Sequence, residues 1–259
     1  MKRTLLVAAA LLLLLPAVAA NAAVVYTEDF SYVAASQLNG QGGWAAHSGA
    51  GTSPHLISAS GLTYAGYPGS GVGLAVGPLA TSGEDNNHTF TGQTSGVVYL
   101  SFLVNVTSTQ TTGDYFIHLF DGAVGSGAFF GRVFVKKDPA STNFDFGIQL
   151  RSTGPAAYTL AYSFTPGTTY LVVMKYTFVA GANNDTVALF VNPTLGGVEP
   201  APNLTTSNAT DADATNLDGV AIRQGSAANA ASVTVDAIRV STTWIDATTP
   251  VSLQSFEAD

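Results

Sequence analysis

The sequence predicts an all-β fold, a sandwich or barrel of antiparallel strands. Short runs that alternate apolar and polar residues recur about every 8–12 residues, which is typical of such folds. Gly, Pro, Asn, Asp or Ser residues bound each run and supply turn chemistry. Glu and Lys, which favour helices, are too scarce to predict an amphipathic helix of useful length.

The clearest strands lie at 97–106, 144–150, 170–178 and 186–192. In the first, Val98, Leu100 and Phe102 fall on one face, because successive side chains of a strand point to opposite faces. We therefore expect each of these strands to bury one face of a sheet.

Weaker patterns predict further strands and one long loop. The loop covers roughly 193–216 and is rich in Pro, Thr and Asn. Loops of that length in a compact domain are often functional. The further strands are predicted at 24–30, 55–58, 72–76, 114–120, 128–136, 158–163, 217–223 and 232–240.

The N-terminus has the order of a secretory signal peptide. Lys2 and Arg3 precede an uninterrupted apolar run from Leu5 to Leu15, and small residues follow Pro16. The run is shorter than the about 20 residues that span a bilayer, which favours a signal over an anchor. Cleavage after Ala19 or Ala22 fits, and we favour Ala22. The predicted organisation is a signal peptide at 1–22, a β-sandwich domain at 23–246, and a linker or the start of a C-terminal region at 247–259.

Charge and cysteine content exclude several classes of function. Loss of Lys2 and Arg3 takes the net charge from −8 to −10. The remaining Lys and Arg residues do not cluster along the chain, so we expect no nucleic-acid partner. No later segment is long enough to span a membrane after signal cleavage. The chain has no cysteine, which excludes thiol catalysis and Cys-based zinc sites.

Three carboxylates are candidate metal ligands. Asp236 shares one face of the last predicted strand with Ile238 and Val240, and a buried carboxylate is costly unless it is paired or coordinated. Glu28 and Asp29 would lie close by if the first and last strands pair. These oxygens suit Ca²⁺, so we expect either a calcium site or a hydrogen-bonded structural aspartate. No other cofactor is predicted.

Two other polar segments carry weaker signals. DADATNLDG at 211–219 has short oxygen ligands in alternation, but no Glu follows at the twelfth position of a calcium loop. GEDNNHTF at 83–90 could bind a cation or a sugar hydroxyl. A solvated acidic loop and a polar hairpin end are the alternatives.

No recognisable catalytic constellation is present, so we expect no enzymatic activity. No two of the four Glu residues are near each other in sequence, whereas a glycanase needs paired carboxylates. Asp114 and His118 are predicted to share a strand face with Phe116 and Phe120. A lyase would need Tyr, His and Arg together, for which Tyr115, His118 and Arg132 are candidates.

Four aromatic residues in or near Gly-rich loops are the candidate ligand-binding residues. An aromatic face can stack on a sugar ring while nearby amides and carboxylates bind its hydroxyls. The alternative for each is packing in the core. The candidates are Trp44, Tyr64, Tyr67 and Tyr158.

Three segments resemble one family. EDFSYVAASQLNGQGGW at 28–44, GLTYAGYPGSGVGLAV at 61–76 and VDAIRVSTTWIDATTP at 235–250 are similar to segments of secreted bacterial concanavalin A-like (laminin-G-like) jelly-roll modules of cell-surface proteins. The resemblance implies two antiparallel sheets packed face to face, with the first and last strands side by side.

The predicted function is non-catalytic recognition outside the cell. We expect a secreted or cell-surface β-sandwich module whose partner is an extracellular glycan or cell-surface polymer. The alternatives are a structural or adhesive protein without a small ligand, and a polysaccharide-acting hydrolase or lyase.

Overall fold

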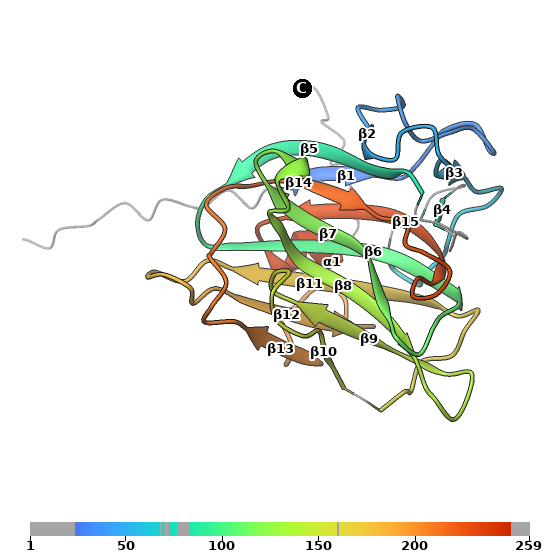
Figure 1. Cartoon of the computed structure of the whole chain (residues 1–259). Coiled ribbons are helices and arrows are strands. Elements are labelled where there is room, and N and C mark those ends of the chain that lie inside the picture. The colour runs from blue at the N-terminus through green and yellow to red at the C-terminus, as the bar shows by residue number, and fades with distance from the viewer. Residues whose placement is uncertain (1–23, 68, 70–72, 77–82, 160, 250–259) are drawn as a thin grey trace, which may run out of the picture.

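The computed structural model describes residues 24–67, 69, 73–76, 83–159 and 161–249. The predicted signal peptide at 1–22 and the tail beyond residue 249 lie outside these residues. Within them, the strands form two antiparallel sheets, one of eight strands and one of seven, which face each other (Figure 1). The expected antiparallel jelly-roll sandwich is thereby confirmed.

The eight-stranded sheet is organised around the last strand, β15. One side of β15 pairs with β6, and the other side pairs with β4 at its start and with β1 at its end. The first and last strands therefore lie side by side, as expected. In order across the sheet, the strands are β13 (Leu204–Ser207), β12 (Thr186–Val191), β11 (Thr169–Thr177), β6 (Val97–Ser108), β15 (Ser232–Ser241), β4 (Leu74–Val76) and β3 (Leu56–Ile57), with β1 (Val24–Glu28) beside β15.

The seven-stranded sheet lies in front of the other sheet in Figure 1. Its strands in order are β10 (Ala157–Tyr158), β9 (Phe144–Gln149), β8 (Phe129–Lys137), β7 (Asp114–Asp121), β14 (Leu217–Ile222), β5 (Asp85–Gln93) and β2 (Ala45–Ser48). The described residues add a short 3₁₀ helix, Val124–Ser126, and one five-residue α-helix, α1 (Trp244–Thr248). No helix among them is long and apolar enough to cross a membrane.

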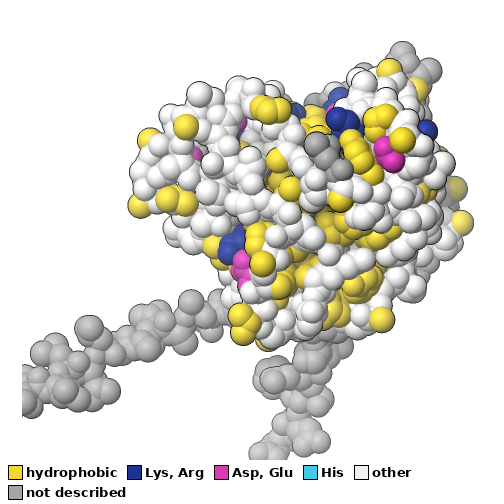
Figure 2. Space-filling model, turned by 90° about the horizontal axis from the view of Figure 1, so that it is seen from below, with side chains coloured by type: hydrophobic (Ala, Val, Ile, Leu, Met, Phe, Trp, Pro, Cys, Tyr) yellow, Lys and Arg dark blue, Asp and Glu magenta, His cyan; other side chains and the backbone are white. Residues whose placement is uncertain are grey.

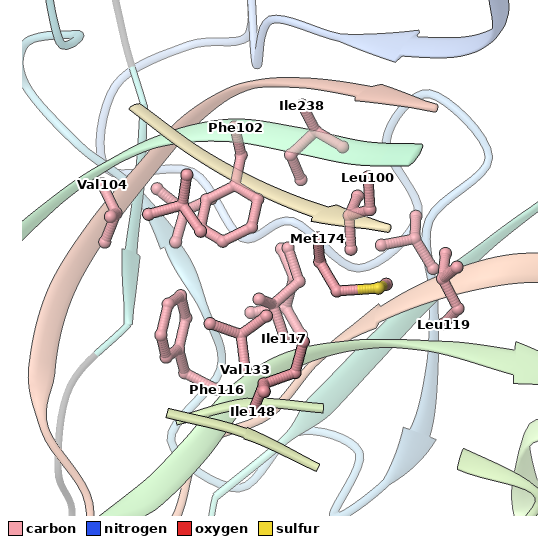
Figure 3. Close-up of a cluster of buried hydrophobic side chains, with 14 of the residues drawn as sticks. Leu100, Phe102, Val104, Phe116, Ile117, Leu119, Val133, Ile148, Met174 and Ile238 are labelled. Carbon is pink, nitrogen blue, oxygen red and sulfur yellow. The ribbon is translucent and has the colours of Figure 1, made fainter. Parts of the chain in front are cut away.

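The main core lies between the two sheets. Alternate residues of β6, among them Leu100 and Phe102, meet Phe116 of β7 and Val133 of β8 (Figure 3). The rings of Phe102 and Phe116 contact edge to face with centroids 5.9 Å apart. This packing follows directly from the alternation in the sequence.

A second, smaller core covers the opposite face of the eight-stranded sheet. Tyr99 and Leu103 of β6 point away from the main core and pack with Tyr67, Phe190 and Trp244. The indole NH of Trp244 donates to the Gly196 carbonyl, 3.3 Å away. The expectation that β6 and β11 each bury one face is therefore wrong, because residues of the 62–67 segment, Leu195 and α1 pack on the other face.

The packed domain also continues past its predicted end. Ala247 and Thr248 in α1 are fully buried, and the Thr248 hydroxyl accepts a hydrogen bond from the Gly196 NH. A boundary at residue 246 would divide this helix. The predicted domain end is thus short by at least two residues.

Some strand boundaries differ from the predictions. The polar segment 83–90 is not a hairpin end, because most of it belongs to the long strand β5. The predicted loop at 193–216 contains β13. Of the predicted strand at 158–163, Tyr158 belongs to β10, and residue 160 lies outside the described residues.

Substituting Phe102 by Ala should destabilise the protein by about 3–5 kcal/mol, because the change leaves a cavity between the sheets. Urea unfolding followed by tryptophan fluorescence measures the loss. Val198→Ala is the control, since Val198 is 93% exposed and its truncation should change stability by less than about 0.5 kcal/mol. Equal effects of the two substitutions would contradict this assignment of the core.

Candidate functional site

A row of half-buried aromatic rings crosses the face of the seven-stranded sheet that points away from the core, here called the outer face. Tyr115 of β7 lies 5.4 Å from Phe134 of β8, and Phe134 lies 6.4 Å from Tyr158 of β10, measured between ring centroids. The ring planes are tilted by 50° and 79°. Because of this tilt the three rings do not form a flat platform; Phe134 and Tyr158 line a groove, and Tyr115 lies next to it beside Phe134.

The groove has a defined pocket at its β10 end. Its volume is about 470 Å³, and its lining includes Phe134, Lys136, Tyr158 and Gly113. The Lys136 ammonium lies 5.3 Å from the centroid of the Tyr158 ring. The pocket thus combines aromatic rings with a positive charge, which are groups that can hold a polar ligand with apolar faces.

Close backbone packing fixes the position of Tyr158. Its ring lies over Gly147 of β9, so close that a Cβ there would be 2.4 Å from Tyr158 Cε1. Tyr158 and Gly147 are cross-strand partners in the β10–β9 pair. Glycine at 147 therefore lets the ring lie against the sheet and leaves one part of Tyr158 open to the groove.

A bulge in β7 decides which of its side chains reach the outer face. Between Tyr115 and Ile117, β7 has one residue more than β8, so Phe116 and Ile117 both enter the core, and a second shift before Leu119 places an extra residue in β8. Tyr115 and His118 consequently share the outer face, with ring centroids 5.6 Å apart. The expectation that His118 shares a face with Phe116 is wrong, because strict alternation does not survive a bulge.

A layer of buried polar groups lies beside these rings. Arg132 of β8 places its guanidinium 4.3 Å from the Tyr115 ring centroid, although the residue is only 9% exposed. His118 is 1% exposed, donates from Nδ1 to the Leu119 carbonyl, and packs 4.3 Å from the Phe129 ring. Gln149 of β9 is the cross-strand neighbour of Arg132 and is also buried. The structure thus brings together the three candidate lyase residues Tyr115, His118 and Arg132.

An ion pair borders the other side of Tyr115. The Arg223 guanidinium lies 4.5 Å from the Tyr115 ring centroid and 2.7 Å from an Asp114 carboxylate oxygen. Asp85 lies on neighbouring β5 and accepts a hydrogen bond from the Gln224 NH. Burial raises the pKa of Asp85 to about 6, and this hydrogen bond and Arg223 oppose the rise. Asp114 is thus committed to Arg223, which does not favour an acid–base pair with His118.

The face of the molecule seen from below is mostly uncharged. The view from below shows hydrophobic and uncharged polar atoms with a few charged side chains among them (Figure 2). This agrees with a composition in which charged residues make up 10% of the chain. Charged side chains are therefore few on this face.

Three of the four predicted ligand-binding aromatics lie away from this groove. Trp44 is a core residue, 1% exposed, whose indole NH donates to Glu28. Tyr67 is 5% exposed in the smaller core, where its hydroxyl lies 2.9 Å from Ser101 Oγ. Neither ring has a face for a sugar. Tyr64 is half-buried beside that smaller core, and Tyr158 alone joins the groove.

The predicted metal ligand Glu28 is already satisfied by the protein. Its carboxylate accepts hydrogen bonds from the Phe30 NH at 2.6 Å, the Tyr32 hydroxyl at 2.8 Å and the Trp44 indole NH at 2.8 Å. Asp29 next to it accepts from the Ser31 NH. Glu28 therefore serves as a buried acceptor that anchors β1 to the segment leading to β2.

Asp236, the third predicted metal ligand, lies where β15 bulges between its two partners β4 and β1. Its carboxylate accepts hydrogen bonds from the Leu62 NH at 2.7 Å and the Ala237 NH at 2.6 Å. Ala237 takes a left-handed conformation, with φ of 49°. Asp236 thus binds the backbone at an irregular point of the sheet, in line with the alternative of a structural aspartate.

In the part of the chain that the structure describes, no three His, Asp or Glu residues group closely enough to hold an ion. Calcium binding stays a prediction.

The acidic segment 211–219 also bonds to the protein. Asp211 is 2% exposed and accepts from Asn208 Nδ2, while Asp213 accepts from the NH groups of Asn184 and Asp185. The side chain of Asp218 accepts from the Gly122 NH. These bonds fix the connection into β14.

Comparison with known proteins bears on the fold alone. No protein-family model and no curated protein matches the chain. The globular domain of T. cruzi calreticulin is similar over 84% of this chain and 88% of its own, with 14% identity and a TM-score of 0.51. The carbohydrate recognition domain of Emp47p is similar over 86% of this chain and 97% of its own, with 10% identity and a TM-score of 0.44. The CBM2 module of an evolved Dit protein of Lactobacillus casei BL23 phage J-1 is similar over 87% of this chain and 96% of its own, with 13% identity and a TM-score of 0.45. The calreticulin likeness agrees with the jelly-roll sandwich.

Two buried histidines should make stability fall in mild acid. Burial lowers the pKa of His55 to about 4 and that of His118 to about 3. From about pH 6.5 downward the unfolded chain binds protons at these residues and the folded chain does not, until the folded pKa is reached. Each histidine thus lowers the free energy of unfolding by about 1.4 kcal/mol per pH unit in that window. The raised pKa of Asp85 has the opposite effect. Between about pH 6 and the usual pKa of an aspartate, the folded chain binds a proton at Asp85 more readily than the unfolded chain does, so stability rises as the pH falls and part of the loss is offset.

Urea unfolding at a series of pH values between about 7 and about 4.5 measures the slope. His55→Gln should reduce the slope, whatever its effect on stability at neutral pH. An unchanged slope in this variant would show that the pKa of His55 is the same in the folded and the unfolded protein.

Proposed function

We propose that this protein is secreted and binds a glycan in the groove on the outer face of the seven-stranded sheet. The observation that carries the proposal is the row of Tyr115, Phe134 and Tyr158, half-exposed rings on three strands. Sugar rings have apolar faces that stack on aromatic rings and hydroxyls that need hydrogen-bonding groups. Lys136 in the pocket and the guanidinium groups of Arg132 and Arg223 beside Tyr115 supply hydrogen-bonding groups.

The arrangement of the two sheets supports this choice of face. The opposite surface of the sandwich is covered by a packed smaller core, in which Tyr67 and Trp244 are buried. The outer face of the seven-stranded sheet instead presents half-buried rings beside a pocket. Partly exposed aromatic side chains in a groove are typical of ligand sites. A structural or adhesive protein without a small ligand would not need such a pocket.

Binding can be tested on a glycan array with the purified chain, in calcium and in chelator. For a glycan that binds, Tyr158→Ala should weaken affinity by at least about tenfold, or about 1.4 kcal/mol, because it removes one side of the groove. Tyr64→Ala is the matched control, since it truncates a half-buried tyrosine beside the smaller core.

Isothermal titration calorimetry measures both affinities, and circular dichroism checks that each variant folds. Loss of affinity in Tyr64→Ala but not in Tyr158→Ala would move the site to the other sheet. A folded protein that binds no glycan in either buffer would refute the proposal and favour an adhesive role. A glycan that binds in the calcium buffer but not in chelator would show that binding requires calcium.

A second candidate, a lyase of acidic polysaccharides, is favoured by the convergence of Tyr115, His118 and Arg132. Such an enzyme needs a base to take a proton beside a carboxylate and a cation to stabilise the resulting charge. Tyr115 lies between the two guanidinium groups of Arg132 and Arg223. Incubation with polyuronates, followed by ultraviolet absorbance of unsaturated ends, tests this candidate, and Tyr115→Phe should abolish any activity found.

A further inference from the structure

Three basic side chains lie at the outer face, together with the carboxylates of Asp114 and Asp145, in a protein that is acidic as a whole. The net charge is −8, and seven basic residues follow Arg3. Three of these seven, Arg132, Lys136 and Arg223, lie around the row of aromatic rings. Basic residues that do not cluster along the sequence therefore do so in space.

The two arginines differ in how the protein neutralises them. Arg223 has Asp114 as its ion-pair partner, 2.7 Å away. Arg132, although only 9% exposed, has neither an ion pair nor a hydrogen bond from its guanidinium among the described residues, and its Nε is buried without an acceptor. Its contacts are the rings of Tyr115 at 4.3 Å and Phe134 at 5.6 Å. Such rings offset only part of the cost of burying a cation.

The neighbour of Arg132 has the complementary deficit. Gln149 is 6% exposed, and its Oε1 is buried without a donor. Arg132 and Gln149 are opposite each other in the β8–β9 pair. Both of these atoms are buried, so a ligand would meet the two outer nitrogens of the Arg132 guanidinium, which make no hydrogen bond among the described residues. The carboxylate or sulfate group of an acidic sugar is an acceptor for them.

We propose that the glycan bound at this groove is anionic and that Arg132 binds its carboxylate or sulfate group. This inference rests on the proposed glycan-binding function and names its ligand class. The guanidinium can form paired hydrogen bonds to either anion, which gives both charge and geometry. Arg132 is thus the residue that selects acidic over neutral glycans, while Tyr115, Phe134 and Tyr158 contact the sugar rings.

The test measures binding of the purified full chain to three polymers: polygalacturonate, which carries carboxylates, dextran sulfate, which carries sulfates, and neutral dextran. Calorimetry or affinity electrophoresis should show binding to one or both acidic polymers and weaker binding as salt is added. Arg132→Gln should reduce that affinity by about tenfold to a hundredfold, as expected for loss of a buried charged hydrogen bond. Arg132→Lys should recover part of it.

Lys175→Gln is the matched control. It removes one positive charge from the other sheet, where Lys175 pairs with Glu199 at 2.9 Å, and should leave affinity unchanged. Thermal unfolding checks each variant, and if Arg132→Gln does not fold, Arg132→Lys carries the comparison with the unmutated chain. Preference for the sulfated or the carboxylated polymer identifies which anion Arg132 binds.

Three results would overturn the inference. Equal losses in Arg132→Gln and Lys175→Gln would show that only net charge matters. Binding to neutral dextran as strong as to the acidic polymers would refute the ligand class but leave glycan binding intact. A folded chain that binds none of these polymers, nor any neutral or acidic sugar on the array, would refute the glycan-binding function together with the inference.

Discussion

Burial of the eight-stranded sheet on both faces is the constraint on which the arrangement of the molecule depends. β6 and β11 contribute Phe102 and Met174 to the core between the sheets, and Leu103 and Val173 to the smaller core on the other side. The smaller core covers the central strands of that sheet, so no row of rings is open there, although a pocket of about 290 Å³ lies at β1 and β15. The half-exposed rings lie instead on the outer face of the seven-stranded sheet.

The bulge in β7 determines which groups lie on that face. Without it, Tyr115 and His118 would point to opposite sides of the sheet, since they are three residues apart. The shift between Tyr115 and Ile117 lets Phe116 and Ile117 both fill the core and turns His118 outward beside Tyr115. A bulge beside a cluster of polar and aromatic groups is a common way to redirect side chains at a site.

Much of the fold was predictable because burial follows alternation. The runs around Phe102, Phe146 and Val172 form β6, β9 and β11 as expected. β5 was missed because its buried positions include polar residues, such as Asn86, which lies 2.6 Å from His55 Nδ1. A hydrophobic pattern cannot reveal a strand whose inward side chains are hydrogen-bonded.

The site was less predictable than the fold, for two physical reasons. Proximity to glycine does not distinguish a ring that covers the core, such as Trp44, from one that lies flat on a strand, such as Tyr158. The bulge that unites Tyr115, His118 and Arg132 has no mark in the alternation of β7. The lyase triplet named from residue type alone is nevertheless the one that the fold assembles.

The scarcity of charged residues in this protein makes the buried guanidinium of Arg132 informative. In a protein rich in surface ion pairs, one arginine without a carboxylate would carry little information. The described residues of this chain form two ion pairs, and Arg132 takes part in neither. Burying the charge of Arg132 against two aromatic rings costs free energy, and this cost lowers the stability of the protein without a ligand. If an anion binds there, it recovers part of that cost, so binding and folding stability are linked through the same residue. An arginine that destabilises the empty fold and is compensated by its ligand is consistent with selection for acidic glycans rather than for a stable outer face.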